Sequence, residues 1–356
     1  MAARSEEDFN SSSLEQRLGM SQTLRAMVTG GGGFLGSKIV SMLLAEGCSV
    51  QSFSRNEYPE LKARGVVCHR GDLADRQAVS DAFQDTDVVF HVAAKAGIWG
   101  EYSEYYAANV TGTRNVIEAC LRNRVAKLVY TSTPSVAFGG RDVRSANEEE
   151  PLPKKYLAHY LTTKAAAERL VIEANSSTLA TVTLRPHLIW GPGDTQLFPR
   201  IAKRRLANRL MLVGSGDNLV DSTFIDNAAR AHLVAAQRLT PGGPVAGRAY
   251  FISQGDPRPV RYLINAILET AGLPPVKRSI PLPVAYLAAC FLELGYSMFH
   301  VTNEPPVTRL SVLEMGRDHY FDISAARRDF GYHPAISIEE GLERMRSAFA
   351  NDRRSR

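Results

Sequence analysis

Short apolar runs alternate with helical patterns along the first half of the chain. The runs are rich in β-branched and aromatic residues, which favours strands, whereas the segments between them repeat apolar residues every three to four positions, which favours helices. The predicted strands cover 24–29, 49–54, 65–69, 88–94, 127–131 and 181–189. The predicted helices cover 34–46, 78–83, 109–121 and 160–174. This order predicts a parallel sheet with helices on both faces.

Right-handed crossovers between such strands give an α/β fold with a Rossmann-like, doubly wound parallel sheet. After the last predicted strand the alternation becomes irregular, and Pro and Gly gather at 241–244 and 272–283. We therefore expect a smaller, discontinuous C-terminal substrate lobe. The expected divisions are a flexible leader over 1–21, an NAD(P)-binding domain over 22–190, and a mainly substrate-binding lobe over 191–356, with some segments returning to the Rossmann core.

A glycine-rich loop separates the first predicted strand from the first predicted helix. Gly30 would permit the tight turn, Gly33 would let a pyrophosphate approach the backbone, and Gly36 would let helix and strand pack closely. The free N–H groups at a helix N-terminus attract phosphate, and Phe34 and Leu35 would lie beside it. A loop of this kind between a strand and a helix is typical of dinucleotide binding.

The end of the second predicted strand bears on the choice of dinucleotide. NAD enzymes place an acid there to bind the ribose hydroxyls, but Ser52-Phe53-Ser54-Arg55 contains none. Ser54 can donate to a 2′-phosphate, and Arg55 can pair with it or stack on adenine. The sequence thus favours NADP(H), with NAD(H) as the alternative. Asp72 is placed to contact the adenine amine or, alternatively, to cap a helix, and Leu73 lies beside it.

Tyr160 and Lys164 stand four residues apart on a predicted helix, so they share one face. A nearby ammonium, aided by the positive charge of the nicotinamide, favours the phenolate and lowers the tyrosine pKa from about 10, which would let Tyr160 exchange a proton with a substrate oxygen. Thr133 and Ser135 follow the strand 127–131, whose C-terminal end faces the ligand crevice. We expect Thr133 to hold the substrate oxygen, with Ser135 as its substitute. A simple turn or cap is the alternative for Thr133.

Charge and cysteine content limit the partners. The formal charge is +5, and the densest basic run, Lys203-Arg204-Arg205 with Arg209, is short. We therefore expect no nucleic-acid partner, and interpret the run as a solvated helix face or, alternatively, a site for an acidic substrate or lipid headgroup. The four cysteines form no CxxC pair, and no histidine lies at ligand spacing. We expect no metal site, reduced thiols and a cytoplasmic location.

One long apolar stretch lies in the second half, over 284–292, with mostly apolar neighbours up to 299. Glu293 interrupts it, and a membrane-spanning helix needs ~20 apolar residues. We interpret the stretch as a buried or lid helix of the substrate lobe. The alternative is a membrane-surface helix over 284–299 that guards an apolar pocket and associates the protein with a membrane.

Taken together, the motifs resemble the extended short-chain dehydrogenase/reductases. Beside the glycine loop and Tyr160-x-x-x-Lys164, the chain carries Tyr106-x-x-Asn109-Val110-x-Gly112-Thr113 and Arg185-Pro186-x-x-Ile189-Trp190-Gly191-Pro192-Gly193. The segments Val89-Phe90-His91-Val92-Ala93-Ala94-Lys95-Ala96-Gly97 and Phe321-Asp322-Ile323-Ser324 narrow the resemblance to the 3β-hydroxysteroid dehydrogenase branch. Within that branch, the chain looks most similar to the bacterial 2-alkyl-3-oxoalkanoate reductases.

The resemblance implies an oxidoreductase that moves a hydride between NADP and a secondary alcohol or ketone on a bulky apolar substrate. It implies that Asn109 orders a water or the Lys164 side chain in proton relay. Contacts with cofactor or substrate are expected for Ala93, Ala94, Lys95, Pro186 and His187. A homodimer that packs the helices around 102–124 and 160–174 is also expected from the resemblance.

Two other enzyme functions stay open, a 3β-hydroxysteroid dehydrogenase and a nucleotide-sugar epimerase. Steroid relatives that prefer NAD carry an acid after the second strand, and its absence weakens the first. Sugar dehydratases of this kind place an Asp-Glu pair after the catalytic Thr, where this chain has Pro134-Ser135, so dehydration is disfavoured. A non-catalytic NADP sensor would usually lack Tyr160 and Lys164.

Overall fold

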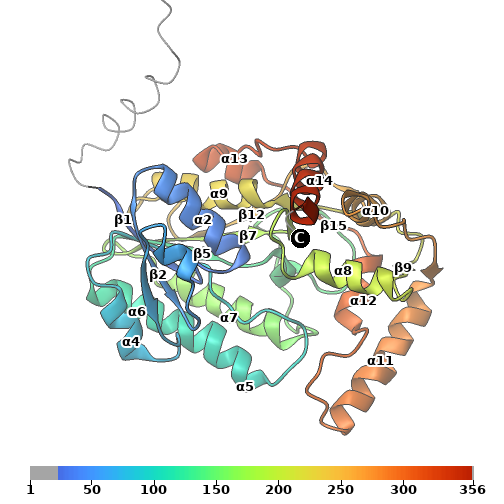
Figure 1. The fold of residues 1–356 in the computed structure, drawn as a ribbon. Helices are drawn as coiled ribbons and strands as arrows, with labels where there is room; N and C mark the ends of the chain where they lie inside the picture. Colours follow the sequence, from blue (N-terminus) through green and yellow to red (C-terminus); the bar gives the residue numbers. More distant parts are fainter. Residues whose placement is uncertain (1–22, 355–356) are drawn as a thin grey trace, which may run out of the picture.

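The computed structural model describes residues 23–354, and the leader expected over 1–21 lies outside them. Within the described residues, seven parallel strands form the main sheet in the order β12-β7-β5-β4-β1-β2-β3 (Figure 1). Their bounds are β1 (Arg25–Thr29), β2 (Ser49–Ser54), β3 (Val67–Arg70), β4 (Val88–His91), β5 (Lys127–Thr131), β7 (Ala180–Pro186) and β12 (Arg248–Ile252).

The chain enters this sheet at its centre and reverses direction once. It runs from β1 outward through β2 to β3, then crosses to β4 on the other side of β1 and continues outward. The doubly wound parallel sheet expected from the sequence is thereby confirmed. In such a sheet the ligand crevice lies beyond the carboxyl ends of the strands at the point of reversal, here between β1 and β4.

Helices cover both faces of the sheet because the strands alternate their side chains between two cores. Ala26 and Val28 of β1 join one apolar cluster, and Met27 between them joins the other. On one face α2 (Phe34–Ala45) packs against α9 (Ile225–Arg238). The other face is covered by α4 (Arg76–Ala82), α6 (Gly112–Arg122) and α7 (His159–Glu173) (Figure 1).

The second lobe is built mainly from the second half of the chain. A mixed sheet has the order β13-β10-β15-β6, and two small sheets pair β8 with β11 and β9 with β14. The strands are β6 (Val143–Ala146), β8 (Ile189–Trp190), β9 (Leu212–Val213), β10 (Leu219–Val220), β11 (Thr223–Phe224), β13 (Arg258–Pro259), β14 (Ser279–Ile280) and β15 (His319–Phe321). The helices are α8 (Leu197–Leu206), α10 (Val260–Thr270), α11 (Leu282–Met298), α12 (Arg309–Gly316), α13 (Ser324–Phe330) and α14 (Ile338–Arg354). From the same half, β12 and α9 complete the main sheet and its cover.

Several predicted bounds are wrong where the chain leaves the sheet. The strand expected over 88–94 ends at His91, and the one over 181–189 divides after Pro186 into β7 and β8. The apolar pattern continues past both ends because the following residues line a cavity instead of pairing in the sheet. The helix expected over 109–121 is α6, which follows α5 (Tyr102–Tyr105) and a π-helical turn, Tyr106–Thr111.

The remaining differences are small shifts in the bounds of two elements and one additional short helix. The third strand is Val67–Arg70 instead of 65–69, and the following helix begins at Arg76 instead of Ala78. Asp75 sets that start, since its carboxylate accepts hydrogen bonds from the N–H groups of Gln77 and Ala78. The short helix α3 (Pro59–Lys62) was not expected.

Candidate active site

A cavity of about 750 Å³ lies at the carboxyl ends of the main strands, between the sheet and helices α8, α10 and α12. It brings together all of the site residues expected from the sequence except Asn109. These lining residues are Gly30, Gly33, Phe34, Leu35, Gly36, Ser54, Arg55, Asp72, Leu73, Ala93, Ala94, Lys95, Thr133, Ser135, Tyr160, Lys164, Pro186 and His187.

The glycine loop leaves room that side chains would fill. A Cβ on Gly36 would meet the carbonyl oxygen of Gly30 at 2.1 Å, so only glycine lets α2 start this close to the turn. Gly30 has φ +72°, a conformation that favours glycine, and a Cβ there would press on Ala93 at 3.1 Å. The N-cap of α2, Gly33, makes no side-chain hydrogen bond, and the first turn holds no acid. The loop therefore fits the pyrophosphate of a dinucleotide.

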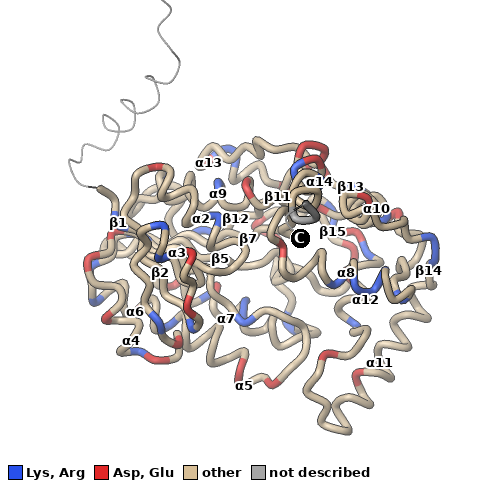
Figure 2. The backbone as a smooth tube through the Cα atoms, in the orientation of Figure 1, with Lys and Arg blue, Asp and Glu red and all other residues tan. Residues whose placement is uncertain are grey.

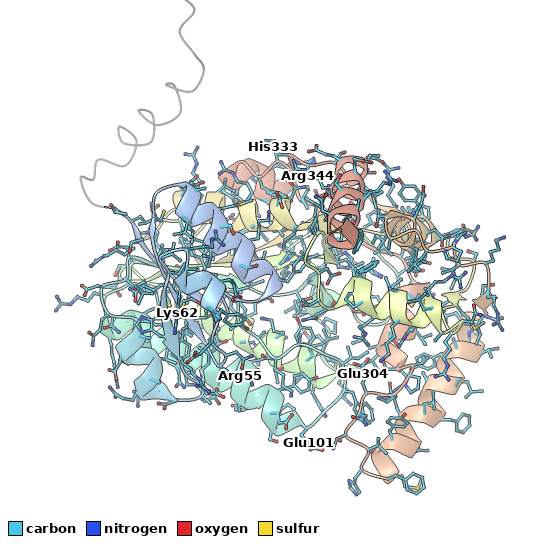
Figure 3. The ribbon with its side chains drawn as sticks, in the orientation of Figure 1. Arg55, Lys62, Glu101, Glu304, His333 and Arg344 are labelled. Atoms are coloured by element: carbon cyan, nitrogen blue, oxygen red, sulfur yellow. The ribbon has the colours of Figure 1, made fainter. Side chains whose placement is uncertain are left out.

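The end of β2 offers free donors beside this loop. The buried Ser54 Oγ has no hydrogen-bond partner among the described residues. The guanidinium of Arg55, labelled in Figure 3, is exposed and makes no ion pair with any residue of the described range 23–354. Both groups fit a phosphate on the adenosine ribose. Asp72 lines the cavity too, and its carboxylate accepts the N–H of Ala74 at 2.9 Å in the turn before α4. The helix cap that the sequence offered as its alternative role belongs to Asp75 instead.

Lys164 is buried one helical turn after Tyr160 on α7. Its Nζ donates to the carbonyl oxygen of Thr131 at 2.6 Å and lies 4.2 Å from the centre of the Tyr130 ring. Burial lowers the pKa of Lys164 to about 7, although the Glu168 carboxylate raises it. The lysine is therefore fixed by the end of β5 and held in place beneath the cavity.

Tyr160 keeps its proton in the protein alone. Burial and the charge of Glu314 raise the pKa of Tyr160 to about 12, and a hydrogen bond from Thr133 opposes this rise. In the protein alone desolvation therefore dominates, and the lowering of this pKa by Lys164 together with a bound nicotinamide stays a prediction. A protonated phenol facing the cavity is suited to donate a proton to a substrate oxygen.

Thr133 caps a turn and also lines the cavity, so its position is compatible with both roles that the sequence left open. Its side chain accepts the N–H of Ser135 at 3.3 Å and so caps the 3-10 turn Pro134–Ala137. The same residue lines the cavity beside Tyr160. The Ser135 hydroxyl donates to Glu314 Oε1 at 3.1 Å, so it is already engaged.

Asn109 lies behind the cavity wall. Its amide nitrogen donates to Thr163 Oγ1 at 3.0 Å and to the Lys95 carbonyl at 3.1 Å, and its oxygen accepts the Lys95 N–H at 2.8 Å. Its hydrogen bonds thus reach Thr163 and not the Lys164 side chain, and the ordering of a water, which the resemblance implies as the other possibility, stays a prediction. Asn109 ties the loop at Lys95 to α7. The Lys95 ammonium pairs with Glu104 at 2.8 Å.

Glu314 and His319 are cavity residues that sequence reasoning missed. Burial raises the pKa of the Glu314 carboxyl to about 7. His319 Nδ1 lies 3.0 Å from His187 Nε2, and burial lowers the pKa of both imidazoles, so both are neutral at pH 7. No local motif marks these residues, because only the packing of α12 and β15 brings them to the site.

The wall opposite the glycine loop is mostly apolar. It includes Ile98, Leu161, Leu188, Leu210, Val220, Leu263, Ile264, Ile267, Leu310 and Met315. Two cations from α8 interrupt it. Arg200 pairs with Glu304, which Figure 3 labels between α8 and α11. Arg204 donates to the Pro306 carbonyl and pairs with no acid among the described residues. The wall can therefore hold an apolar body with an acidic group.

Comparisons with known proteins agree with this site. The family model described as "3-beta hydroxysteroid dehydrogenase/isomerase family" matches residues 27–284. A 2-alkyl-3-oxoalkanoate reductase of Stenotrophomonas maltophilia is 48% identical, over 92% of this chain and 100% of its own. The enzyme of the same name from Shewanella oneidensis is 46% identical, over 91% and 86%. A mouse sterol-4-alpha-carboxylate 3-dehydrogenase is 32% identical, over 95% and 94%.

Solved structures share the fold along nearly the whole chain. MoeE5 in complex with UDP-glucose and NAD matches with a TM-score of 0.72 and 25% identity, over 93% of this chain and 99% of that one. The family model covers the glycine loop, Thr133, Tyr160 and Lys164. The resemblance expected from the sequence is confirmed: the chain belongs to the 3β-hydroxysteroid dehydrogenase/isomerase family and is an NAD(P)-dependent oxidoreductase of the extended short-chain type.

Proposed function

We propose that this enzyme reduces the 3-keto group of a 2-alkyl-3-oxoalkanoate, with NADP(H) as the preferred cofactor. The observation that carries the proposal is the meeting, in one cavity, of the glycine loop, the group Thr133, Tyr160 and Lys164, and an apolar wall. The relatives at 48% and 46% identity, both named 2-alkyl-3-oxoalkanoate reductases, support the substrate class.

The chemistry divides between cofactor and protein. A bound nicotinamide supplies the hydride that reduces the ketone. Thr133 would donate a hydrogen bond to the ketone oxygen and hold it near Tyr160, which passes its proton to that oxygen. Lys164, held by Thr131, stabilises the resulting phenolate with its positive charge. Asn109 acts as a positioning residue, since it fixes α7 through Thr163.

The choice of NADP(H) rests on the end of β2. Residues 52–56 include no carboxylate to bind ribose hydroxyls. The unpartnered Ser54 hydroxyl and the free Arg55 guanidinium instead complement a 2′-phosphate.

The acid group of the substrate has a counterpart in Arg204. An arginine stays charged at any pH that a protein tolerates, and this one reaches the cavity without an acidic partner among the described residues. The long alkyl chains would lie along the apolar wall. A sugar nucleotide would leave that wall in contact with hydroxyl groups, which disfavours the epimerase alternative.

The direct test follows NADPH and NADH oxidation with three substrates: a 2-alkyl-3-oxo acid, a 3-oxosteroid and UDP-glucose. We expect turnover with the oxo acid, and faster turnover with NADPH than with NADH. In Tyr160→Phe, turnover should fall at least 100-fold while NADPH binding changes less than twofold. Faster turnover of the steroid, or an active Tyr160→Phe variant, would contradict the proposal.

We also propose a cytoplasmic homodimer. All four cysteines are free thiols, as is usual in a reducing compartment. Tyr102, Tyr106 and Leu121, on the helical segments over 102–122, are exposed and could pack against a second copy. Light scattering of the eluted protein measures the subunit number.

A further inference from the structure

Helix α11 carries a row of large apolar side chains on its outer face. Val284, Leu287, Phe291, Leu294 and Met298 follow one another at steps of three and four, which places them on one side of the helix, and Phe299 extends the row. They are between 55% and 76% exposed, whereas the small Ala285 and Ala289 are the buried residues of this helix. We call these six exposed residues the α11 ridge. The interpretation of 284–292 as a buried helix is therefore wrong for its large side chains.

No charge interrupts the ridge. Glu293 is the charged residue of α11, and it turns inward, where both carboxylate oxygens accept hydrogen bonds from Arg309 at 2.6 Å. Figure 2 shows α11 almost wholly without charged residues, at one corner of the molecule. Scattered exposed apolar residues are ordinary on a soluble protein, but a continuous row of six marks an interaction site.

A cationic cluster lies at the N-terminal end of α11. Arg209, Lys277 and Arg278 are exposed and have no acidic partner among the described residues. The Leu212 N–H donates to the Arg278 carbonyl at 2.9 Å, which places the segment after Arg209 beside the one that leads into α11. Figure 2 shows basic residues gathered at this end, near β14 and α8.

The ridge is also connected to the wall of the active-site cavity. Helix α12 packs against α11 and contributes Leu310, Glu314 and Met315 to that wall. At the other end of α11, Trp99 Nε1 donates to the Val301 carbonyl at 3.0 Å. Trp99 directly follows Ile98, which lines the cavity, so this hydrogen bond links the end of α11 to the cavity wall. A surface bound by α11 would therefore lie next to the site of an apolar substrate.

We propose that the α11 ridge seats this enzyme on the surface of a lipid bilayer that carries anionic headgroups. The ridge would enter the boundary between headgroups and acyl chains, and the cationic cluster would meet the lipid phosphates. Within residues 23–354, no helix is long and apolar enough to cross a membrane. In this proposal α11 would lie along the plane of the bilayer surface. The inference deepens the proposed function, since it names the bilayer as the source of the water-insoluble substrate.

The same features argue against a second copy of the chain as the occupant. Helices that pair through such a row carry charged residues beside it to set partner and orientation, but Ala288, Gly295 and Ser297 stand at those positions. In a twofold dimer through α11, the cationic cluster of one subunit would either face the cationic cluster of the other or have no acidic group opposite it. Neither arrangement would stabilise the dimer.

Flotation of the full chain with vesicles tests the proposal without turnover. We expect binding to vesicles of phosphatidylcholine and phosphatidylglycerol, weaker binding to phosphatidylcholine alone, and weaker binding in 0.5 M salt. Phe291→Ser with Leu294→Ser should lower the bound fraction at least tenfold. Leu24→Ser with Val67→Ser, which removes two exposed apolar residues of the main domain that lie outside the proposed dimer surface, should leave it unchanged.

Three results would overturn the proposal: no binding of the unmodified chain to anionic vesicles, equal losses in both double variants, or a ridge variant that stays bound and changes only the oligomeric state. Circular dichroism and NADPH binding check that each variant is folded. Reduction of a short, water-soluble 3-oxo acid should be the same in the unmodified chain and the ridge variant. If the unmodified chain binds vesicles but reduces no oxo acid, the proposed function fails and the docking surface stands.

Discussion

Lys164 shows how a reactive residue can oppose folding. The residue is 1% exposed, and burial lowers the pKa of its ammonium from 10.5 to about 7. The unfolded chain therefore binds this proton more tightly than the folded protein does, so the charge destabilises the fold at neutral pH. The contribution vanishes above the unfolded pKa and grows as the pH falls toward the folded value. One unit of pKa corresponds to about 1.4 kcal/mol, so the penalty at pH 7 is a few kcal/mol.

We predict that Lys164→Met abolishes turnover but raises the free energy of unfolding by about 1–4 kcal/mol at pH 7, less at pH 9. Urea unfolding at the two pH values measures this difference. Lys62→Met is the matched control, because Lys62 is exposed at the surface (Figure 3) and should change stability by under about 0.5 kcal/mol. A variant that is less stable than the unmodified chain, or a gain that does not depend on pH, would contradict this account.

Glu314 is predicted to impose an alkaline limit on the reaction. Its carboxyl has a pKa of about 7 and raises the pKa of Tyr160 when it is ionised. Above pH 7 its negative charge also opposes the approach of an acidic substrate. In Glu314→Gln, which keeps an oxygen to accept the Ser135 hydroxyl, the fall of kcat/KM between pH 7 and 9 should be at least threefold smaller.

The measurement is kcat/KM from pH 6 to 9 for both proteins. Lys164 titrates in the same range, so the informative quantity is the difference between the two profiles. Glu101→Gln serves as a control, because Glu101 is exposed, lies outside the cavity lining and makes no ion pair among the described residues (Figure 3). Parallel profiles for the unmodified chain and Glu314→Gln would exclude this role.

At the scale of elements, the close approach of α2 to the turn after β1 depends on one missing side chain. A Cβ on Gly36 would overlap the Gly30 carbonyl oxygen at 2.1 Å. Because the overlapped atoms belong to the backbone of the turn, the overlap could be relieved only by moving α2 away from that turn. We predict that Gly36→Ala lowers the free energy of unfolding by at least 2 kcal/mol and weakens NADPH binding at least tenfold. Thermal unfolding and fluorescence titration measure the two effects.

Gly295→Ala is the control for this substitution. Gly295 is helical, and a Cβ there would meet nothing within 4 Å, so alanine should be neutral or stabilise the fold by about 0.5–1 kcal/mol. Equal effects of the two substitutions would show that helix propensity, and not the contact with Gly30, decides the outcome.

The sequence predicted the elements whose signals are local. The glycine loop, the strands of the main sheet and the spacing of Tyr160 and Lys164 are patterns within a few residues. The structure contains these strands in one sheet, and the glycine loop, Tyr160 and Lys164 line one cavity at its edge. The strand ends at His91 and Pro186 were missed, because apolar residues that line a cavity look like residues that fill a core. The π-helical turn Tyr106–Thr111 was missed as well. The sequence left α11 open between a buried or lid helix and a membrane-surface helix, since apolarity does not reveal which face is covered.

Non-local contacts explain the rest. Glu314 lies 179 positions from Ser135, and His319 lies 132 positions from His187, so no window of sequence contains either pair. In the protein alone, burial raises the pKa of Tyr160, which the sequence could not indicate, because the lysine neighbour is visible in the sequence whereas desolvation is a property of the whole fold.

At the scale of the whole molecule, the cofactor cavity joins the main sheet to the second lobe, so a ligand in it should stabilise both together. A ligand that binds the folded state alone raises stability by RT ln(1 + [L]/Kd), about 2.7 kcal/mol at a concentration of 100 Kd. Because Ser54 and Arg55 complement a 2′-phosphate, we predict a larger rise of Tm with NADPH than with NADH at equal concentration.

Arg55→Gln tests whether that difference arises at the end of β2. The substitution removes the free guanidinium, so the additional rise of Tm with NADPH should disappear while the rise with NADH remains. Arg64→Gln, at another exposed position of the same domain, should behave as the unmodified chain does. Calorimetry with each nucleotide separates the outcomes. If Arg55→Gln keeps the full NADPH advantage, another group must bind the 2′-phosphate. If the unmodified chain responds equally to both nucleotides, the assignment of NADP(H) is wrong.

The same calorimetry shows whether the two lobes unfold together. We expect a single transition that moves to higher temperature as a whole when the nucleotide binds, because the ligand lies between the lobes and stabilises both.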